Sequence, residues 1–141
     1  MHHQLRKNFD IVTIFLFQLY FRIPNVDILQ VDVTNENHII HAAEHVKQKY
    51  GKLELLINNA GLLHPSGKGE TRLSDVNFED MQTLFNINAA GPLMVARYFA
   101  PLLQKGEGSI GAGGHKGMLV NITARAGSIE DNKLGGWYGY R

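Results

Sequence analysis

The sequence has no cysteine, and its charges are nearly balanced, with 14 lysines and arginines against 13 aspartates and glutamates. Without cysteine there is no disulfide framework and no thiolate chemistry, which suits a reducing compartment. We therefore expect a cytoplasmic protein, and an organelle would fit equally well. The net charge is only +1, and the basic residues are scattered rather than arranged in a stripe. This gives no electrostatic basis for a nucleic-acid partner, and we expect none.

Long apolar runs are also missing. The longest, Ile11 to Phe21, is interrupted by Gln18, and it is shorter than the ~20 residues of a membrane-spanning helix. Arg6 and Lys7 precede it, as in a signal peptide, but no small-residue cleavage site follows. We expect no membrane partner and interpret the run as a buried strand or helix, or as aberrant sequence.

The chain has 141 residues, of which 44% are hydrophobic, so it can bury one ordinary core and form one domain. Apolar segments rich in β-branched residues alternate with segments of helical spacing. The expected strands are 27–33, 53–57 and a buried 118–123; the expected helices are one from the N-cap Thr34 to Gly51 and a long one over 78–103; a surface loop over 62–75 and a glycine-rich loop over 106–117 join them. This order predicts an α/β fold with right-handed crossovers, an incomplete part of a Rossmann-like doubly wound parallel sheet.

The stretch from Leu55 to Gly61 reads Leu-Leu-Ile-Asn-Asn-Ala-Gly. Continuous apolar runs are typical of parallel strands covered on both faces, and ligands bind at the carboxyl ends of such strands. Asn58 and Asn59 offer donors and acceptors, and Gly61 leaves room for a close backbone approach. The same tetrapeptide is compatible with a plain turn.

Gly91 and Pro92 interrupt the long helix. Pro92 has no N–H, so the carbonyl of Asn88 loses its helical partner, and a carbonyl freed at a kink can hold a water. The alternative is a simple proline kink with Asn88 facing solvent, and the spacing alone does not separate the two.

Hydroxyl groups mark two later positions. Thr123 ends the last strand, where a hydroxyl can polarise a substrate carbonyl or cap its own backbone. The chain then closes with Trp137-Tyr138-Gly139-Tyr140-Arg141. A phenol, with a pKa of about 10, needs a neighbouring cation to exchange protons near neutral pH.

A motif of another class lies at His41, Glu44 and His45, which match the H-x-x-E-H pattern of inverted zinc peptidases. The pattern is short and occurs by chance. The apolar positions of this helix place the histidines toward solvent, so we expect no metal and keep a zinc peptidase as a remote alternative.

The tetrapeptide Asn58-Asn59-Ala60-Gly61 after an apolar strand resembles the NNAG signature of the short-chain dehydrogenase/reductase family. The resemblance covers residues 24–141 and leaves 1–23 as an atypical segment. It implies NAD(P)-dependent carbonyl reduction or alcohol oxidation on a small-molecule carbonyl substrate. The end of the chain is most similar to the C-factor-like carbonyl reductase subgroup, which favours NADP over NAD.

The resemblance also implies roles for individual residues. Asn88 would hold a relay water on its carbonyl, and Tyr140, placed by Arg141, would be the catalytic tyrosine, with Tyr138 left for packing. The family usually has a second serine where Ala124 stands, so Thr123 is the nearest hydroxyl and Ser128 the next. The catalytic residues implied are Asn88, Thr123 and Tyr140, and the cofactor-binding residues are Asp32, Val33, Asn59, Ala60 and Gly61.

Compared with the family pattern, the chain is expected to be truncated at both ends. A glycine-rich turn that seats a pyrophosphate belongs before Asp27, yet residues 1–23 contain no glycine, and the lysine that assists the tyrosine would fall four residues after Tyr140. We expect the chain alone to be inactive, and the alternative is a non-enzymatic product that pairs with a full-length relative. A homo-oligomer could form through the helix 78–103.

Overall fold

A computed structural model of the protein describes residues 11–15, 26–108, 110, 116–130, 133 and 135–141. Its elements in chain order are β1 (Ile11–Phe15), β2 (Val26–Gln30), α1 (Glu36–Lys49), β3 (Leu55–Asn58), the 3-10 turn η1 (Leu73–Asp75), α2 (Phe78–Phe85), the π-helical turn η2 (Asn86–Ala90), α3 (Gly91–Leu103), β4 (Met118–Asn121) and the 3-10 turn η3 (Arg125–Gly127). Most of the segment 1–23 and part of the loop 106–117 lie outside the described residues.

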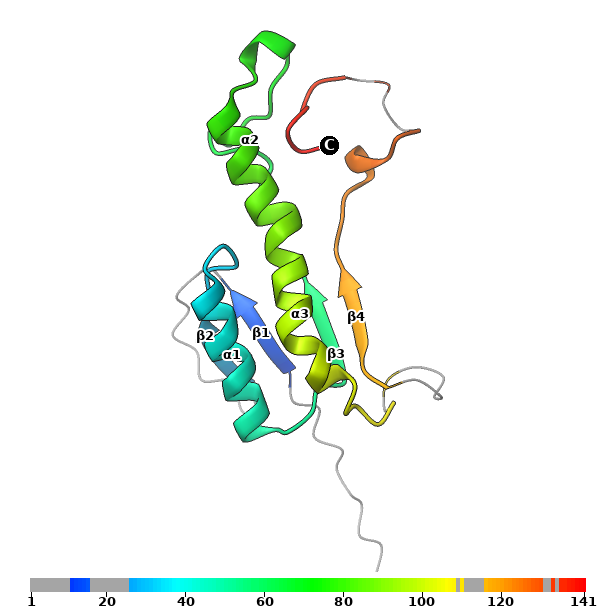
Figure 1. The fold of residues 1–141 in the computed structure, drawn as a ribbon. Coiled ribbons are helices and arrows are strands. Elements are labelled where there is room, and N and C mark those ends of the chain that lie inside the picture. Colours follow the sequence, from blue (N-terminus) through cyan, green and yellow to red (C-terminus); the bar gives the residue numbers. More distant parts are fainter. Residues whose placement is uncertain (1–10, 16–25, 109, 111–115, 131–132, 134) are drawn as a thin grey trace, which may run out of the picture.

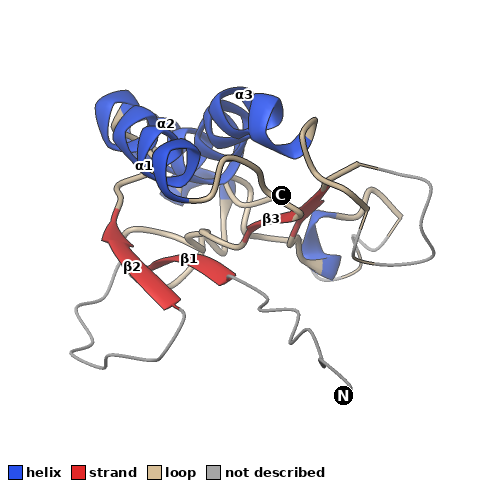
Figure 2. Ribbon diagram, turned by 90° about the horizontal axis from the view of Figure 1, so that it is seen from below, coloured by secondary structure: helices blue, strands red, loops and turns tan. Residues whose placement is uncertain are grey.

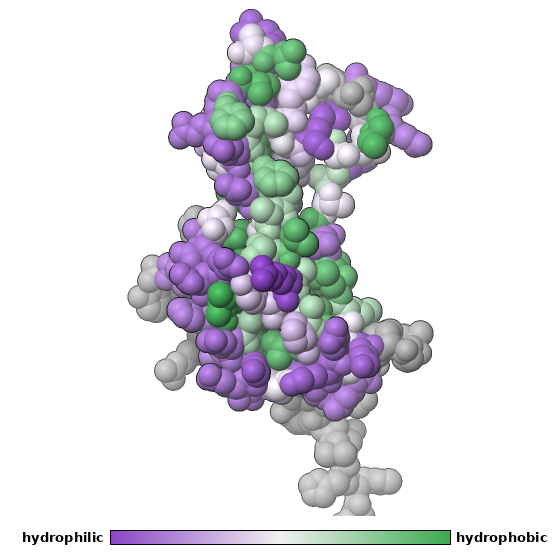
Figure 3. Space-filling view, in the orientation of Figure 1, coloured by the Kyte–Doolittle hydropathy of each residue, from purple (hydrophilic) through white to green (hydrophobic). Residues whose placement is uncertain are grey.

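The strands form two parallel pairs, β1 with β2 and β3 with β4. All three long helices lie on the same side of the strands (Figure 2). The helix 78–103 extends beyond the strands, where α2, the loop before it and the end of the chain form a separate upper part (Figure 1), and the molecule narrows between the two parts (Figure 3). The predicted α/β class with parallel strands is confirmed.

One face of the β3–β4 pair is uncovered. Ile57 and Val120 stand opposite each other across the two strands, and they are 52% and 37% exposed. The prediction that both strands are buried was therefore wrong: the described helices lie on the other side (Figure 2), and even there Leu119, opposite Leu56, is 43% exposed. Leu56, whose side chain points the opposite way in the pleat, is 6% exposed.

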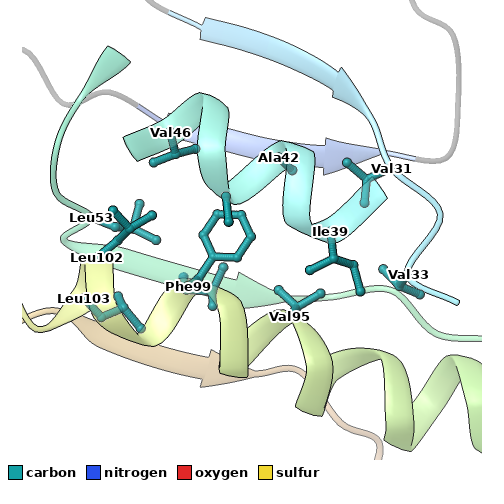
Figure 4. Close-up of a cluster of buried hydrophobic side chains, with 12 residues drawn as sticks. Val31, Val33, Ile39, Ala42, Val46, Leu53, Val95, Phe99, Leu102 and Leu103 are labelled. Carbon is teal, nitrogen blue, oxygen red and sulfur yellow. The ribbon is translucent and has the colours of Figure 1, made fainter. Parts of the chain in front are cut away.

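The core lies between α1 and α3. Phe99 of α3 is 1% exposed and sits between the two helices (Figure 4). Ile39 and Val46 of α1 face it with almost no exposed area, because their spacing of seven residues places them on one face of the helix. Burying side chains of this size contributes about 1.5–3 kcal/mol each, so this contact fixes α3 on α1.

The ends of α1 show one error and one success of the sequence reasoning. The N-cap is Asn35 rather than Thr34, because the Asn35 side chain accepts hydrogen bonds from the backbone of Asn37 and His38. Thr34 instead donates its hydroxyl to Asp32, at 2.7 Å. Gly51 ends the helix as predicted, in a left-handed conformation with φ of 74° that favours glycine.

Asp27 on β2 fastens the far end of α1. Its carboxylate accepts hydrogen bonds from His45 Nε2 at 2.9 Å, Lys49 Nζ at 2.6 Å and Tyr50 Oη at 2.8 Å. These bonds, the one from His45 first, hold the pKa of Asp27 well below its ordinary value.

No helix in the described ranges is long and apolar enough to cross a bilayer.

We expect the hydrogen bonds of Asp27 to make the free energy of unfolding depend on pH in the acidic range. Because the pKa of Asp27 is lower in the folded chain, the stabilisation is complete above the ordinary carboxyl pKa of about 4. It is lost as the pH falls from there through the folded value. The free energy of unfolding, measured in urea between neutral and acidic pH, should fall more steeply with decreasing pH for the wild-type chain than for Asp27→Asn. An equal dependence on pH in the two proteins would contradict the prediction.

Candidate functional site

A pocket of about 410 Å³ opens at the carboxyl ends of β3 and β4. Three segments that are far apart in the sequence line it, namely the residues after β3, the residues after β4 and the last turn of the chain (Figure 1). The lining residues are Asn59, Ala60, Gly61, Leu62, Leu63, Ile122, Thr123, Ala124, Ala126, Trp137 and Tyr140. Five of the predicted site residues are among them.

The two asparagines after β3 have different tasks. Asn58 is buried, and its Nδ2 donates to Asn121 Oδ1 at 2.8 Å and to the Pro92 carbonyl at 3.2 Å. It therefore ties β3 to β4 and to α3. Asn59 points the other way, as alternation in an extended segment requires, and it is exposed in the pocket.

Gly61 is not crowded by the rest of the chain. A Cβ built on it would lie 3.6 Å from the Oδ1 of Asn88, which is ordinary van der Waals contact. The sequence predicted that Gly61 lets another group come close to its backbone, but no other part of the described chain does so. Gly61 is instead one of the residues that line the pocket.

Asn88 lies in the π-helical turn η2, where the Gly91 N–H bonds the carbonyl of Asn86, five residues earlier. The helix is thus irregular where Pro92 predicted a kink, and the irregularity is a π turn. The Asn88 side chain does not face solvent freely. It accepts from the Leu62 N–H and donates to the Leu62 carbonyl, both at 2.8 Å, and so holds the pocket wall directly after Gly61.

The pair of hydrogen bonds to Leu62 gives a testable consequence. Asn88→Ala removes both bonds from a half-buried site and should lower the free energy of unfolding by about 1–3 kcal/mol. Asn86→Ala is the matched control, because Asn86 lies in the same turn and its side chain is exposed. Chemical denaturation of the three proteins checks this, and equal losses for the two variants would contradict it.

Of the two candidate hydroxyls, only Thr123 lines the pocket within the described chain. Thr123 follows β4 by two residues and is exposed there, and Ala124 beside it also lines the pocket. Ser128 follows η3, outside the lining residues.

The last turn of the chain brings Tyr140 into the pocket and leaves Tyr138 out of its lining. The ring of Trp137 meets that of Tyr140 edge to face, with centroids 6.5 Å apart. Trp137 has a φ of 52°, in the left-handed region that non-glycine residues rarely adopt. Arg141 donates from Nη1 to the Ala126 carbonyl at 2.8 Å, which joins this turn to η3.

Asp32 and Val33 do not line the pocket. Asp32 is exposed beyond β2, and hydrogen bonds from the Thr34 hydroxyl and N–H lower the pKa of its carboxyl. Val33 is 7% exposed and packs so closely on Gly91 that a Cβ there would come within 3.0 Å of it. A ligand could meet Val33 only through its main chain.

Sequence reasoning missed two buried residues in the loop 62–75. His64 and Glu70 are 8% and 4% exposed, although the loop was predicted to lie at the surface. Glu70 is buried against the last turn of the chain, in which the Gly139 N–H bonds it across 69 positions of sequence, and His64 lies beside Glu70 and Asp80. No local pattern signals a contact of that range.

The three residues of the histidine motif on α1 do not act together in the structure. His45 bonds Asp27, while His41 and Glu44 are exposed. Among the described residues no group of three or more histidine, aspartate or glutamate side chains could hold a metal ion.

Comparisons with known proteins agree on one family. The family profile of short chain dehydrogenases matches residues 20–139. A short-chain dehydrogenase/reductase of Aspergillus fumigatus is 32% identical over 106 residues, which cover 75% of this chain and 37% of that protein. The C-signal protein of Myxococcus xanthus is 38% identical over 91 residues, 64% of this chain and 48% of that protein.

Two solved structures share the fold. The carbonyl reductase Sniffer of Drosophila melanogaster is 28% identical with a TM-score of 0.72, over 83% of this chain and 48% of that one. An NADPH-bound carbonyl reductase from chicken fatty liver is 31% identical with a TM-score of 0.69, over 84% and 46%. The chain thus spans less than half the length of these four proteins.

Proposed function

The chain belongs to the short chain dehydrogenase family, and from this we propose that it forms the substrate-facing part of an NAD(P)-dependent oxidoreductase. The reaction is the reduction of a small carbonyl compound, or the oxidation of the corresponding alcohol. The observation that carries this proposal is that one pocket gathers Asn59–Gly61, Thr123 and Tyr140 at the carboxyl ends of two parallel strands. Open α/β sheets bind their ligands at such ends.

The residues present fit a nicotinamide group. The pocket of about 410 Å³ lies in the range of small-molecule sites, and Gly61, which has no side chain, is among its lining residues. Asn59, Ala60 and Gly61 would hold the nicotinamide end, and Asp32 with the main chain of Val33 would meet the adenine end. The NADPH bound to the chicken carbonyl reductase supports NADP over NAD. When bound, this group supplies a hydride to the carbonyl carbon.

The chain's own residues supply the proton and the orientation. The Tyr140 phenol donates its proton to the carbonyl oxygen, so that hydride and proton together give the alcohol. The Thr123 hydroxyl hydrogen-bonds the same oxygen and polarises it; its place in the pocket lining favours it over Ser128. The Asn88 carbonyl holds a water that returns a proton to Tyr140.

The test is a hybrid enzyme. Residues 24–141 replace the matched region of the Drosophila carbonyl reductase, so that the fly segments complete the domain. They supply the glycine-rich turn and the lysine that the family places after the tyrosine, which lowers the pKa of the phenol. We expect the hybrid to reduce small aldehydes or ketones with NADPH, monitored by the absorbance of the cofactor.

Two pairs of variants control this experiment. Tyr140→Phe should abolish turnover, while Tyr138→Phe should leave most of it, because only the first removes the transferable proton. Thr123→Val should reduce kcat by about a hundredfold, and Ser128→Ala should leave it near the wild-type value. Full activity of the Tyr140→Phe hybrid would overturn the assignment of the site.

Self-association through the long helix is part of the proposal. Phe78, Met81 and Phe85 are exposed at spacings of three and four residues, which places them on one face of α2. The π turn adds one residue, so Leu93, eight residues after Phe85, stays on the same face and is 69% exposed. Apolar side chains accordingly follow the long helix on the face seen in Figure 3.

The uncovered face of β3–β4 favours a second role, in which the chain pairs with a full-length relative. Ile57 and Val120 are exposed on that face, and exposed apolar patches of a sheet mark sites of association.

Light scattering of the 141-residue chain separates the two surfaces. If the helix face holds a homo-oligomer, Phe85→Asp should yield monomers while Ile57→Asp leaves the assembly intact, because only the first buries a charge in the interface. The opposite pattern would assign association to the sheet face. Ile129→Asp is the control, since Ile129 is 96% exposed and belongs to neither surface.

A further inference from the structure

Glu70 makes two hydrogen bonds to the turn that carries Tyr140. Its main-chain carbonyl accepts from the Trp137 N–H at 2.7 Å, and its side-chain Oε1 accepts from the Gly139 N–H at 3.2 Å. We call these two bonds the Glu70 contact. Trp137 and Gly139 both precede Tyr140 in the last turn, so the contact fixes the backbone before the tyrosine at two points.

The turn is packed against Glu70 without spare room. A Cβ added to Gly139 would come within 2.6 Å of Leu84 Cδ1 and 2.9 Å of Glu70 Oε1. One added to Gly136, whose φ is 67°, would come within 2.8 Å of the Glu70 carbonyl. The backbone therefore approaches Glu70 as closely as only glycine permits.

The carboxylate is an unexpected group in this place. The Glu70 side chain is 2% exposed, and in the described part of the chain its Oε2 has no hydrogen-bond partner. Burial of a charge with an unsatisfied oxygen is strongly unfavourable. An apolar side chain would avoid that cost but would leave the Gly139 N–H without its acceptor.

Charged and polar groups face Glu70 from the loop and from α2. His64 Nδ1 lies 3.2 Å from the Ser66 backbone nitrogen and 2.8 Å from Ser66 Oγ, and the other ring nitrogen, Nε2, faces the carboxylates. That nitrogen lies 3.4 Å from Asp80 Oδ2 and 4.0 Å from Glu70 Oε1. His64 Nε2 makes no hydrogen bond within the described chain, so His64 lies beside Glu70 without satisfying its carboxylate.

From Glu70 the contact reaches the tyrosine by two routes. The Trp137 carbonyl accepts from the Tyr140 N–H at 3.1 Å, and the Trp137 ring packs edge to face on the Tyr140 ring. The left-handed conformation of Trp137 is unfavourable by itself and persists only where surrounding contacts enforce it. The N–H of that residue is bonded to Glu70.

We infer that Glu70 is a positioning residue, which sets the place of the Tyr140 phenol in the pocket through Trp137 and Gly139. This role rests on the proposed function of Tyr140. It explains why a carboxylate stays buried here, because Oε1 is the acceptor that the Gly139 N–H requires.

The first experiment uses the 141-residue chain without any ligand. In Glu70→Leu the amide proton of Gly139 loses its side-chain acceptor and should exchange with solvent about tenfold faster, the effect of losing one hydrogen bond. The Trp137 amide keeps its main-chain acceptor and should change less. The indole N–H signal of Trp137, the single tryptophan, should shift in the NMR spectrum. Glu70→Gln keeps the acceptor oxygen and should stay within about twofold of the wild-type rates.

Glu79→Leu is the matched control, because Glu79 is an exposed carboxylate at the start of α2. Unchanged exchange in Glu70→Leu, or equal acceleration in Glu79→Leu, overturns the inference. If Glu70→Leu does not fold, Gly139→Ala decides, since its added methyl pushes the turn away while Glu70 remains. Faster exchange of the Trp137 and Tyr140 amides supports the inference, and unchanged rates overturn it.

The second experiment uses the active hybrid. Glu70→Leu should lower kcat by about tenfold to a hundredfold with little change in KM, as for a displaced reacting group, and Glu70→Gln should restore most of it. A Glu70→Leu hybrid with the wild-type kcat overturns the positioning role. A wild-type hybrid without activity overturns the proposed function instead, and the exchange rates then show separately whether Glu70 holds the turn.

Discussion

The packing of Phe99 between α1 and α3 is the contact on which the placement of the other parts depends. The two pairs of strands do not form one continuous sheet in the described residues, so hydrogen bonds between strands do not join them. The side chains of α1 and α3 do so instead, with Phe99, Ile39 and Val46 almost fully buried. Because α3 continues through η2 into α2, fixing α3 also fixes the part of the molecule that lies beyond the strands.

Hydrogen bonds at two places on this long helix then position the walls of the pocket. Asn88 in η2 holds Leu62 directly after the Asn-Asn-Ala-Gly segment, and Asn58 joins the end of β3 to both β4 and α3. Leu84 on α2 packs where Gly139 must approach closely. One helix therefore orders the three lining segments, which is why a pocket forms although one face of β3–β4 is open.

The features that break local rules gather around this pocket. They are the π turn at Asn88, the left-handed Trp137 and the buried carboxylate of Glu70. Each is unfavourable taken alone, and such features persist where the surrounding structure enforces them, most often at functional sites. All three adjoin the pocket: Asn88 holds Leu62 in its lining, Trp137 is itself a lining residue, and Glu70 bonds the turn that carries Tyr140.

The sequence by itself determined the α/β class, the parallel strands and the order of the elements, because apolar spacing and glycine positions are local properties of the chain. It also singled out Asn59, Ala60, Gly61, Thr123 and Tyr140, which the tertiary structure brings to one pocket. Periodicity could not show that one strand face is uncovered, since coverage depends on where the helices pack. Nor could it show that Val33 is enclosed by Gly91, that Asn35 rather than Thr34 caps α1, or that Glu70 is buried. The cap was decided locally, by the bonds of Asn35 to Asn37 and His38. The other outcomes were decided by contacts between residues far apart in the sequence, such as the hydrogen bond between Gly139 and Glu70 across 69 positions, and no local pattern encodes them.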